Sequence, residues 1–180
     1  MISLIVAHDP DGVIGVRFPD RPEGFIPWQH SADLRRFKKL TMDGVLIMGS
    51  NTWKTLPPKG LPGREIIVLS HSVAWGPPEL IIATNLGLAL HLADTEFPGR
   101  QVWIAGGANV YREALELGVV DRIDLTLVPK VEIAEGVEIV RFPVNLLESF
   151  DLVSEETNSE DPDLAHRTYR CRISSLRPSS

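Results

Sequence analysis

Short apolar runs recur along the chain, and turn clusters or helical patterns separate them. Six runs have the length and near-continuous apolar character of strands that are buried on both faces of a parallel sheet. They are Ile2–Ala7, Val45–Gly49, Ile66–Ser70, Leu80–Ala83, Val102–Ala105 and Ile123–Pro129. Near the end, Thr168–Ile173 alternates apolar and polar residues, which indicates a half-exposed strand, with Phe150–Glu155 as a weaker partner and the acidic segment Thr157–His166 as their connecting loop.

Helical spacing of apolar residues appears in three segments between these strands. The predicted helices cover Ser31–Leu40, Leu86–Thr95 and Ala108–Leu117. Ser31 and Asn85 are expected to cap the first two helices, because their side-chain oxygens can accept a hydrogen bond from a free backbone N–H. Gly118 suits the C-terminal stop of the third helix.

Strands and helices alternate over residues 1–125, which predicts an α/β fold. We expect one domain over residues 1–173 with a mixed, mainly parallel twisted sheet, flanking helices and antiparallel C-terminal edge strands. The polar residues 174–180 are expected to form a frayed tail.

Composition excludes several classes of protein. The formal net charge is −6, from 18 basic and 24 acidic residues, which argues against a nucleic-acid-binding face. The single cysteine, Cys171, cannot form an internal disulfide, so a reducing compartment is the simplest interpretation. We find no export signal and no apolar stretch near the roughly 20 residues of a membrane span. The chain is therefore predicted to be cytoplasmic, with no membrane and no nucleic-acid partner.

Common catalytic motifs are absent. The sequence contains no G-x-x-x-x-G-K-[ST], no G-x-G-x-x-G after a strand, no H-E-x-x-H and no G-x-S-x-G, and no metal site is predicted from its five scattered histidines.

Two strand-to-helix junctions have the composition of anion sites. One apolar run leads into Gly106-Gly107-Ala108-Asn109 and another into Gly49-Ser50-Asn51-Thr52. Small residues let a phosphate approach the backbone, and a helix start presents free N–H groups to it. Glycine and serine are also ordinary turn residues, so one junction alone would mean little, whereas two favour a dinucleotide site.

Three further features suggest a binding cleft, although each also has an ordinary structural explanation. Asp33 is expected in a first helical turn beside Leu34 and Phe37, where it could accept two parallel N–H donors from a heterocycle, or simply interact with the helix dipole. Arg64 follows a Pro-rich turn and could bind a ligand carboxylate, or lie on the surface. Residues 16–27 contain three prolines and could form a lid or an ordinary loop.

Taken in order, these motifs resemble the dihydrofolate reductase family over residues 1–173. The matching segments are Ile2-Ser3-Leu4-Ile5-Val6-Ala7, Gly12-Val13-Ile14-Gly15, Ile26-Pro27-Trp28, Ala32-Asp33-Leu34 with Phe37, Ile47-Met48-Gly49-Ser50-Asn51-Thr52-Trp53, Leu61-Pro62-Gly63-Arg64, Val68-Leu69-Ser70, Trp103-Ile104-Ala105-Gly106-Gly107 with Val110-Tyr111, and Phe142-Pro143. The resemblance implies NADPH-dependent reduction of 7,8-dihydrofolate to tetrahydrofolate by a monomer that antifolates inhibit.

The resemblance also implies residue roles. Asp33 would hold the pterin and promote its protonation through water, with Thr126 bonded to Asp33, Trp28 ordering the water and Tyr111 near the nicotinamide. Substrate contacts would come from Ile5, Val6, Ala7, Ile26, Asp33, Leu34, Phe37, Lys38, Leu56, Leu61, Arg64 and Ala105, with Arg64 pairing with the glutamate α-carboxylate. Cofactor contacts would come from Ala7, Ile14, Gly15, Gly49, Ser50, Asn51, Thr52, Leu69, Ser70, His71, Ala105, Gly106, Gly107, Ala108, Asn109, Val110 and Tyr111. The Gly106–Gly107 peptide would be cis.

Two departures from the family pattern bear on these expectations. Many members carry Arg or Lys at the positions of Ser50 and Asn51, and bacterial members often carry Arg at Asn109, where they hold the cofactor phosphates. Ser70 and His71 then remain as candidate 2′-phosphate contacts, so we expect a weakened preference for NADPH, with NADH usable. The loop before Trp28 is also longer than in compact bacterial members.

Two alternatives stay open at this point. A riboflavin-pathway reductase shares the fold, and a folate- or nucleotide-binding module could lack turnover. The first would not be expected to carry the Trp28, Asp33 and Arg64 constellation, and the presence of Asp33 with Thr126 argues against the second.

Overall fold

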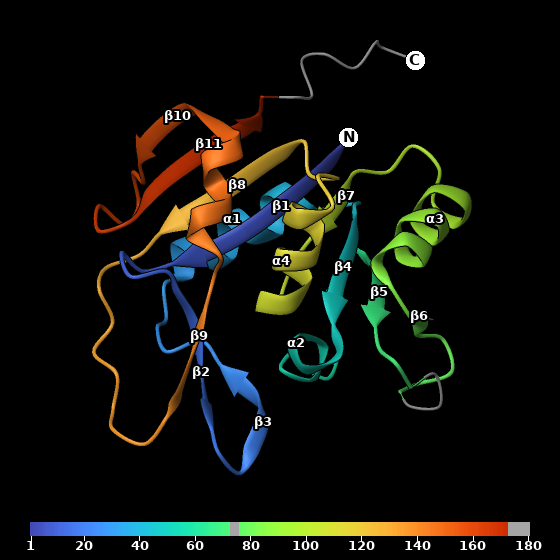
Figure 1. The fold of residues 1–180 in the computed structure, drawn as a ribbon, viewed down its shortest axis with the longest axis horizontal. Helices are drawn as coiled ribbons and strands as arrows, with labels where there is room; N and C mark the ends of the chain where they lie inside the picture. The colour runs from blue at the N-terminus through green and yellow to red at the C-terminus, as the bar shows by residue number, and fades with distance from the viewer. Residues whose placement is uncertain (73–75, 173–180) are drawn as a thin grey trace.

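A computed structural model describes residues 1–72 and 76–172, apart from the side chains of residues 21–23. Its main element is an eight-stranded sheet (Figure 1). In spatial order the strands are β10 (Phe150–Thr157), β11 (Ala165–Cys171), β8 (Arg122–Leu127), β1 (Ile2–His8), β7 (Val102–Ile104), β4 (Val45–Gly49), β5 (Glu65–Leu69) and β6 (Ile81–Ala83). Strands β8, β1, β7, β4, β5 and β6 are parallel neighbours, whereas β10 and β11 are antiparallel, as expected.

The helices lie on both faces of this sheet. They are α1 (Ser31–Thr41), α2 (Ser50–Lys54), α3 (Leu86–Glu96), α4 (Ala108–Glu116) and a 3-10 helix, η1 (Val144–Ser149). Leu4 and Val6 of β1 pack with α3 and α4, whereas Ile5 between them belongs to a second cluster with Phe37 and Leu40 of α1. Because successive side chains of a strand point to opposite faces, α1 covers one face and α3 with α4 cover the other.

The cap predictions have different outcomes. Asn85 caps α3 as expected, since its Oδ1 accepts a hydrogen bond from the backbone N–H of Leu88 at 2.8 Å. Gly118 follows α4 with φ of 63°, the left-handed conformation that ends helices. The prediction for Ser31 was wrong: His30 is the residue before the first turn, and it makes no side-chain cap bond. Its ring instead lies 2.8 Å from Asp161, a contact between segments that local sequence does not reveal.

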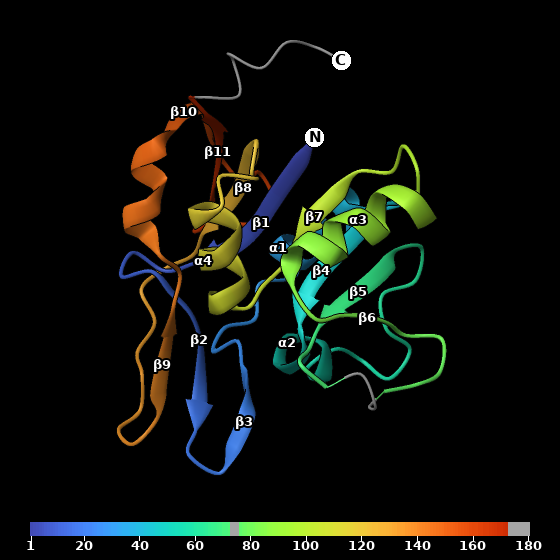
Figure 2. The ribbon, with the colours of Figure 1, turned by 45° about the vertical axis from the view of Figure 1, so that its right-hand side comes forward.

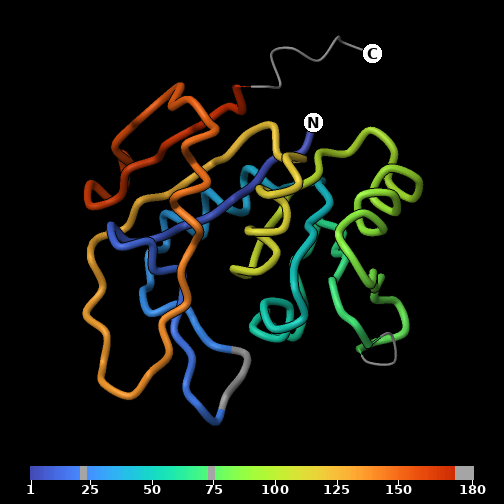
Figure 3. The backbone as a smooth tube through the Cα atoms, viewed as in Figure 1, coloured from blue at the N-terminus to red at the C-terminus, as the bar shows by residue number. Residues whose placement is uncertain are grey.

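Residues 16–27, considered above as a loop, mostly form a β-hairpin. Strands β2 (Val13–Phe18) and β3 (Arg21–Phe25) join β9 (Glu138–Arg141) in a second sheet of order β3-β2-β9 (Figure 2). Prolines and glycine interrupt the alternation that marks a strand, so the pattern hides the hairpin. What fixes β2 is its pairing with β9, which lies more than 100 residues away in sequence but beside β2 in the backbone trace (Figure 3).

Other differences from the expected boundaries are small. Strand β8 stops at Leu127 rather than Pro129, because proline has no N–H to donate to a sheet. Strand β11 begins earlier than expected, which shortens the acidic loop to residues 158–164. Ile173 and the predicted tail over 174–180 lie outside the described residues. Among the helices that are described, none has the length and apolar character to cross a membrane.

Candidate active site

A cleft of about 1360 Å³ lies between the two sheets and reaches the C-terminal ends of the central parallel strands. Its walls come from both sheets and from α1, α2 and α4. Open α/β sheets bind ligands at this edge, because loops and helix starts present backbone N–H groups there.

The cleft brings together nearly all the residues that the sequence analysis nominated. From the substrate and catalytic sets, it is lined by Ile5, Val6, Ala7, Ile26, Trp28, Asp33, Leu34, Phe37, Leu56, Leu61 and Ala105. From the cofactor set, it is lined by Ile14, Gly15, Gly49, Ser50, Asn51, Thr52, Leu69, Ser70, His71, Gly106, Gly107, Ala108, Asn109, Val110 and Tyr111. Three nominated residues are not among the lining residues: Lys38, Arg64 and Thr126.

Asp33 lies in the first turn of α1 and faces the cleft. Burial raises the pKa of this carboxyl above its ordinary value. A hydrogen bond from Thr126 and the positive charge of Arg36 act in the opposite direction, since both favour the ionised form. Asp33 is therefore held between an apolar wall that disfavours its charge and polar groups that stabilise it.

Apolar side chains remain exposed in the cleft that Asp33 faces. Leu34, on the same helix, is 64% exposed, and Ile26 and Phe25 on the facing hairpin segment are 58% and 47% exposed. All three line the cleft. A cleft that combines large apolar side chains with a carboxylate is typical of a site for a flat heterocycle with a polar edge.

Thr126 and Tyr111 are buried polar residues on strand β8 and helix α4. Thr126 is 1% exposed on β8, and Tyr111 is 6% exposed on α4. The Tyr111 hydroxyl donates a 2.8 Å hydrogen bond to the backbone carbonyl of Ile5. Burial raises the pKa of Tyr111, so its hydroxyl keeps its proton and remains a donor to that carbonyl.

The other half of the cleft requires small residues at the ends of β4 and β7. The Gly106–Gly107 peptide is cis, as the resemblance implied, and Gly106 has a φ of 109° that only glycine adopts readily. The backbone N–H of Gly49 donates to the Gly106 carbonyl at 2.8 Å. A Cβ on Gly107 would lie 3.2 Å from the Thr52 hydroxyl oxygen. Side chains larger than hydrogen would therefore fill the space beside the α4 N-terminus.

Comparison with known proteins decides the family. The dihydrofolate reductase family model matches residues 1–175. The chain belongs to the dihydrofolate reductase family. It is similar to the dihydrofolate reductase of Mycobacterium leprae, with 36% identity over 65% of this chain and 67% of that protein. It is also similar to dihydrofolate reductase type 9 of Escherichia coli, with 33% identity over 86% of this chain and 82% of that protein.

A solved structure shows the same fold. The dihydrofolate reductase from Enterococcus faecalis, complexed with NADP(H) and RAB-propyl, superposes with a TM-score of 0.78 at 24% identity, over 96% of both chains. Dihydrofolate reductases are NADPH-dependent enzymes that reduce 7,8-dihydrofolate to tetrahydrofolate, and this chain is one of them. The family model and the two relatives favour this function over the riboflavin-pathway reductase and the non-catalytic module considered above.

The position of Arg64 in this reductase differs from the simple expectation of a side chain open to the cleft. Its guanidinium donates to the Pro62 carbonyl at 3.2 and 3.3 Å and to the Thr41 hydroxyl at 3.4 Å. It also lies over the Phe37 ring, 5.9 Å from the centroid, and Phe37 does line the cleft. Arg64 is thus one side chain removed from the cleft wall. Lys38 is exposed on α1 and is not among the residues that line the cleft.

The reductase also has cleft charges that the sequence analysis missed. Arg36 lines the cleft and donates to Asp124 at 3.3 Å, and Arg122 binds the same carboxylate at 2.7 and 2.8 Å. Asp124 is fully buried, and its carboxylate holds the guanidinium of Arg36 in place. Arg36 lies three residues after Asp33 on α1. Only the spacing of Asp33 and Arg36 on one helix could have suggested this. Three other arginines line the cleft: Arg17, Arg112 and Arg141.

Proposed function

We propose that this enzyme binds dihydrofolate between β1, α1 and the β2–β3 hairpin, and binds NADPH along the ends of β4, β5 and β7. The observation that carries the proposal is the Asp33 carboxyl, placed in the wall of an apolar cleft where Thr126 favours its ionised form. A folate substrate has a matching shape, namely a flat ring with adjacent N–H donors on one edge.

Asp33 would accept the ring N–H and the amino group of the pterin as two parallel hydrogen bonds. This pairing fixes the ring and favours protonation at the ring nitrogen beside the carbon that accepts the hydride. A carboxylate bound to the far edge cannot reach that nitrogen, so the proton would arrive through water. Trp28 lines the same cleft and is proposed to order this water. Ile5 and Ala105 would offer backbone carbonyls to the opposite edge.

The cofactor half of the cleft fits a nicotinamide dinucleotide. Gly49, Gly106 and Gly107 keep the strand ends free of side chains, and the starts of α2 and α4 present N–H groups to phosphates. When bound, NADPH supplies the hydride. Ser70 and His71 line the cleft and remain the proposed contacts to the 2′-phosphate. The hydroxyl of Ser70 forms a tight turn with Ser72, donating to the Ser72 carbonyl at 3.0 Å and accepting from its N–H at 3.2 Å.

Arg64 is proposed to pair with the α-carboxylate of the glutamate tail, and Leu34, Phe37, Leu56 and Leu61 to pack the ring and its aryl linker. The present partners of Arg64 are a backbone carbonyl and a hydroxyl rather than a carboxylate, which leaves its charge available for an anionic group. Inhibition by antifolates, a monomeric state and a cytoplasmic location remain predictions.

The direct test is loss of reduced-nicotinamide absorbance on mixing the purified protein, NADPH and 7,8-dihydrofolate. We expect turnover that depends on both compounds. Turnover with a pyrimidine substrate of riboflavin synthesis and none with dihydrofolate would contradict the proposal, as would binding without turnover.

A further inference from the structure

A chain of side-chain interactions links Asp33 with the acidic loop over residues 158–164. His166 on β11 lies opposite Thr126 on β8, and its Nδ1 is 3.3 Å from the Thr126 hydroxyl oxygen. Its other ring nitrogen, Nε2, is 2.8 Å from the side-chain nitrogen of Asn158. The Thr126 hydroxyl in turn acts on Asp33, where it lowers the pKa of the carboxyl. Three residues from two strands and a loop therefore connect to the proposed substrate-binding carboxyl.

The amide of Asn158 has only one orientation that satisfies its neighbours. Its Oδ1 accepts backbone N–H bonds from Glu160 at 2.7 Å and from Asp161 at 3.0 Å. A flipped amide would place its NH₂ group against two N–H donors. The NH₂ group must therefore face His166, where it donates to Nε2.

This donor determines the protonation state of the ring. Because Nε2 accepts from Asn158, it carries no proton, and a neutral His166 must carry its proton on Nδ1. The Nδ1–H then donates to the Thr126 oxygen. A hydroxyl that accepts from one side is left with its own proton for the other side, where Asp33 lies.

We propose that His166, held by Asn158 as the Nδ1–H tautomer, is a positioning residue that directs the Thr126 hydroxyl proton to Asp33. The proposal rests on the proposed function of Asp33. If the Thr126 hydroxyl proton were not oriented toward Asp33, its interaction with the ionised carboxyl would be weaker. The pterin would then be held less firmly.

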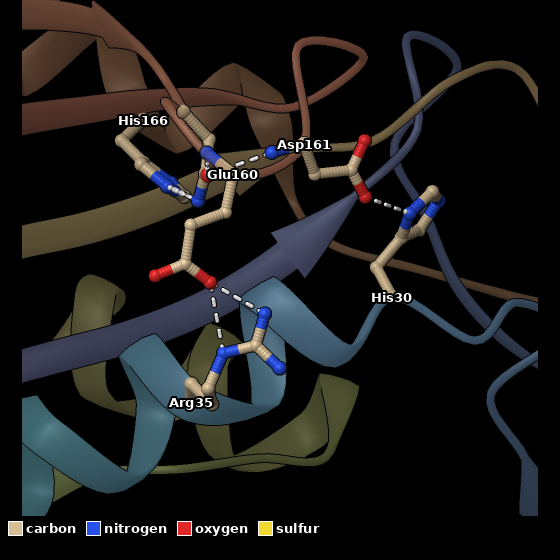
Figure 4. A network of polar contacts seen from close by, with 6 residues as sticks. His30, Arg35, Glu160, Asp161 and His166 are labelled. Atoms are coloured by element: carbon tan, nitrogen blue, oxygen red, sulfur yellow. Dashed lines mark hydrogen bonds and ion pairs between the residues drawn. The ribbon is translucent and has the colours of Figure 1, made fainter.

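The loop that carries Asn158 is tied to the start of the same helix (Figure 4). Asp161 contacts His30, the residue before α1, at 2.8 Å, and Glu160 accepts from the Nε of Arg35 at 2.9 Å. These contacts fix the position of the Asn158 loop relative to α1, and hence relative to Asp33. The Asp161–His30 pair is partly buried, with side-chain exposures of 25% and 21%, whereas the Arg35–Glu160 pair is 60% exposed on both sides. The inner pair is thus the better anchor.

Charged groups from two neighbouring elements face His166. Arg36 and Asp33 act from α1, and Glu156 acts from β10. Burial lowers the pKa of His166, and so does Arg36, while Asp33 and Glu156 raise it; the balance is a lowered pKa. The ring is therefore neutral at pH 7, as acceptance from Asn158 requires. Protonation at acidic pH would place Nε2–H against the Asn158 NH₂ group.

Ring-¹⁵N NMR of the ligand-free wild-type protein at pH 7 tests the tautomer directly, with the His166 signals assigned by their loss in His166→Phe. We expect Nδ1 in the protonated range and Nε2 in the unprotonated range. A protonated Nε2 in the wild-type protein, in either the neutral or the charged ring, would overturn the proposal.

The link to Asp33 is tested with ¹³C-carboxyl titration and single-turnover hydride transfer. His166→Phe removes the donor, so we expect a higher pKa for Asp33 and a roughly fivefold slower hydride step at pH 7. His166→Asn keeps a donor near Nδ1 and should restore both. Glu160→Gln is the matched loop control, since it weakens only the exposed Arg35 pair, and it should change neither. An Asp33 pKa unchanged in His166→Phe would overturn the proposal.

The titration and the tautomer are measured without substrate. They therefore remain decisive even if Asp33→Asn turned out to be fully active, a result that would overturn the proposed function alone.

Discussion

Replacement of Asp33 by asparagine changes one charge in the cleft wall and almost nothing in shape. The amide oxygen can still accept the Thr126 hydroxyl proton, and the NH₂ group occupies the place of the second carboxylate oxygen. What is lost is the ability to accept two parallel N–H bonds from the pterin. We expect kcat/KM for dihydrofolate at pH 7 to fall by about 10² to 10⁴, the range for removal of a positioned acid–base group.

The same substitution should stabilise the folded protein. Burial raises the pKa of Asp33 above 3.8, so the folded protein holds this proton more tightly than the unfolded chain does. Above the ordinary pKa, stability therefore falls as pH rises, and the full cost is present above the folded-state pKa. Each unit of elevation costs about 1.4 kcal/mol. For a chain of this length 1 kcal/mol corresponds to about 2–4 °C in Tm. Asparagine cannot ionise, so the variant avoids this cost.

The assay is thermal unfolding of the ligand-free wild type and variant at several pH values, combined with steady-state turnover. We expect a higher Tm for the variant at pH 7 and a difference that shrinks as the pH falls toward and below 3.8, the ordinary pKa of the unfolded chain, because Asp33 then becomes protonated in both folded and unfolded wild type. A variant less stable than wild type at pH 7, or a gain that does not vary with pH, would refute the electrostatic reasoning. Turnover like that of wild type would refute the role of Asp33.

Three further predictions concern other parts of the cleft. Tyr111→Phe leaves the buried Ile5 carbonyl without its 2.8 Å donor, so chemical denaturation should show a loss of about 1–3 kcal/mol, and unchanged stability would contradict the assigned bond. Arg64→Met should raise KM for dihydrofolate about 10- to 100-fold with kcat nearly unchanged, and an unchanged KM would remove Arg64 from the substrate site. The absence of Lys or Arg at Ser50, Asn51 and Asn109 predicts a kcat/KM ratio of NADPH to NADH below about a thousandfold (roughly 4 kcal/mol), and a larger ratio would contradict it.

The arginines that line the cleft are relevant to the predicted cofactor preference. The net charge of −6 is unfavourable for anionic ligands, yet Arg17, Arg36, Arg112 and Arg141 all line the cleft. Arg17 is partly neutralised by Glu138 at 3.4 Å, and Arg36 by buried Asp124. The cations are therefore present, but away from the positions where the family usually has them.

The sequence alone was sufficient for the central parallel sheet. Val45–Gly49 forms β4 over the predicted residues, because a continuous apolar run of that length is stable only when it is buried on both faces. The Asn85 cap was equally predictable, since it depends on one side chain and a backbone N–H three residues away. The order of the family motifs identified the cleft residues, including Asp33.

Tertiary structure alone decided the rest. The β2–β3 hairpin depends on pairing with β9 across more than 100 residues, and its prolines and glycine conceal the strand pattern locally. The pKa of Asp33 depends on burial, Thr126 and Arg36 together, which come from different elements. The tautomer of His166 depends on an amide whose orientation is set by two loop N–H groups. Periodicity reports which face of a segment is buried, but pairing partners and electrostatic surroundings exist only after distant segments have come together.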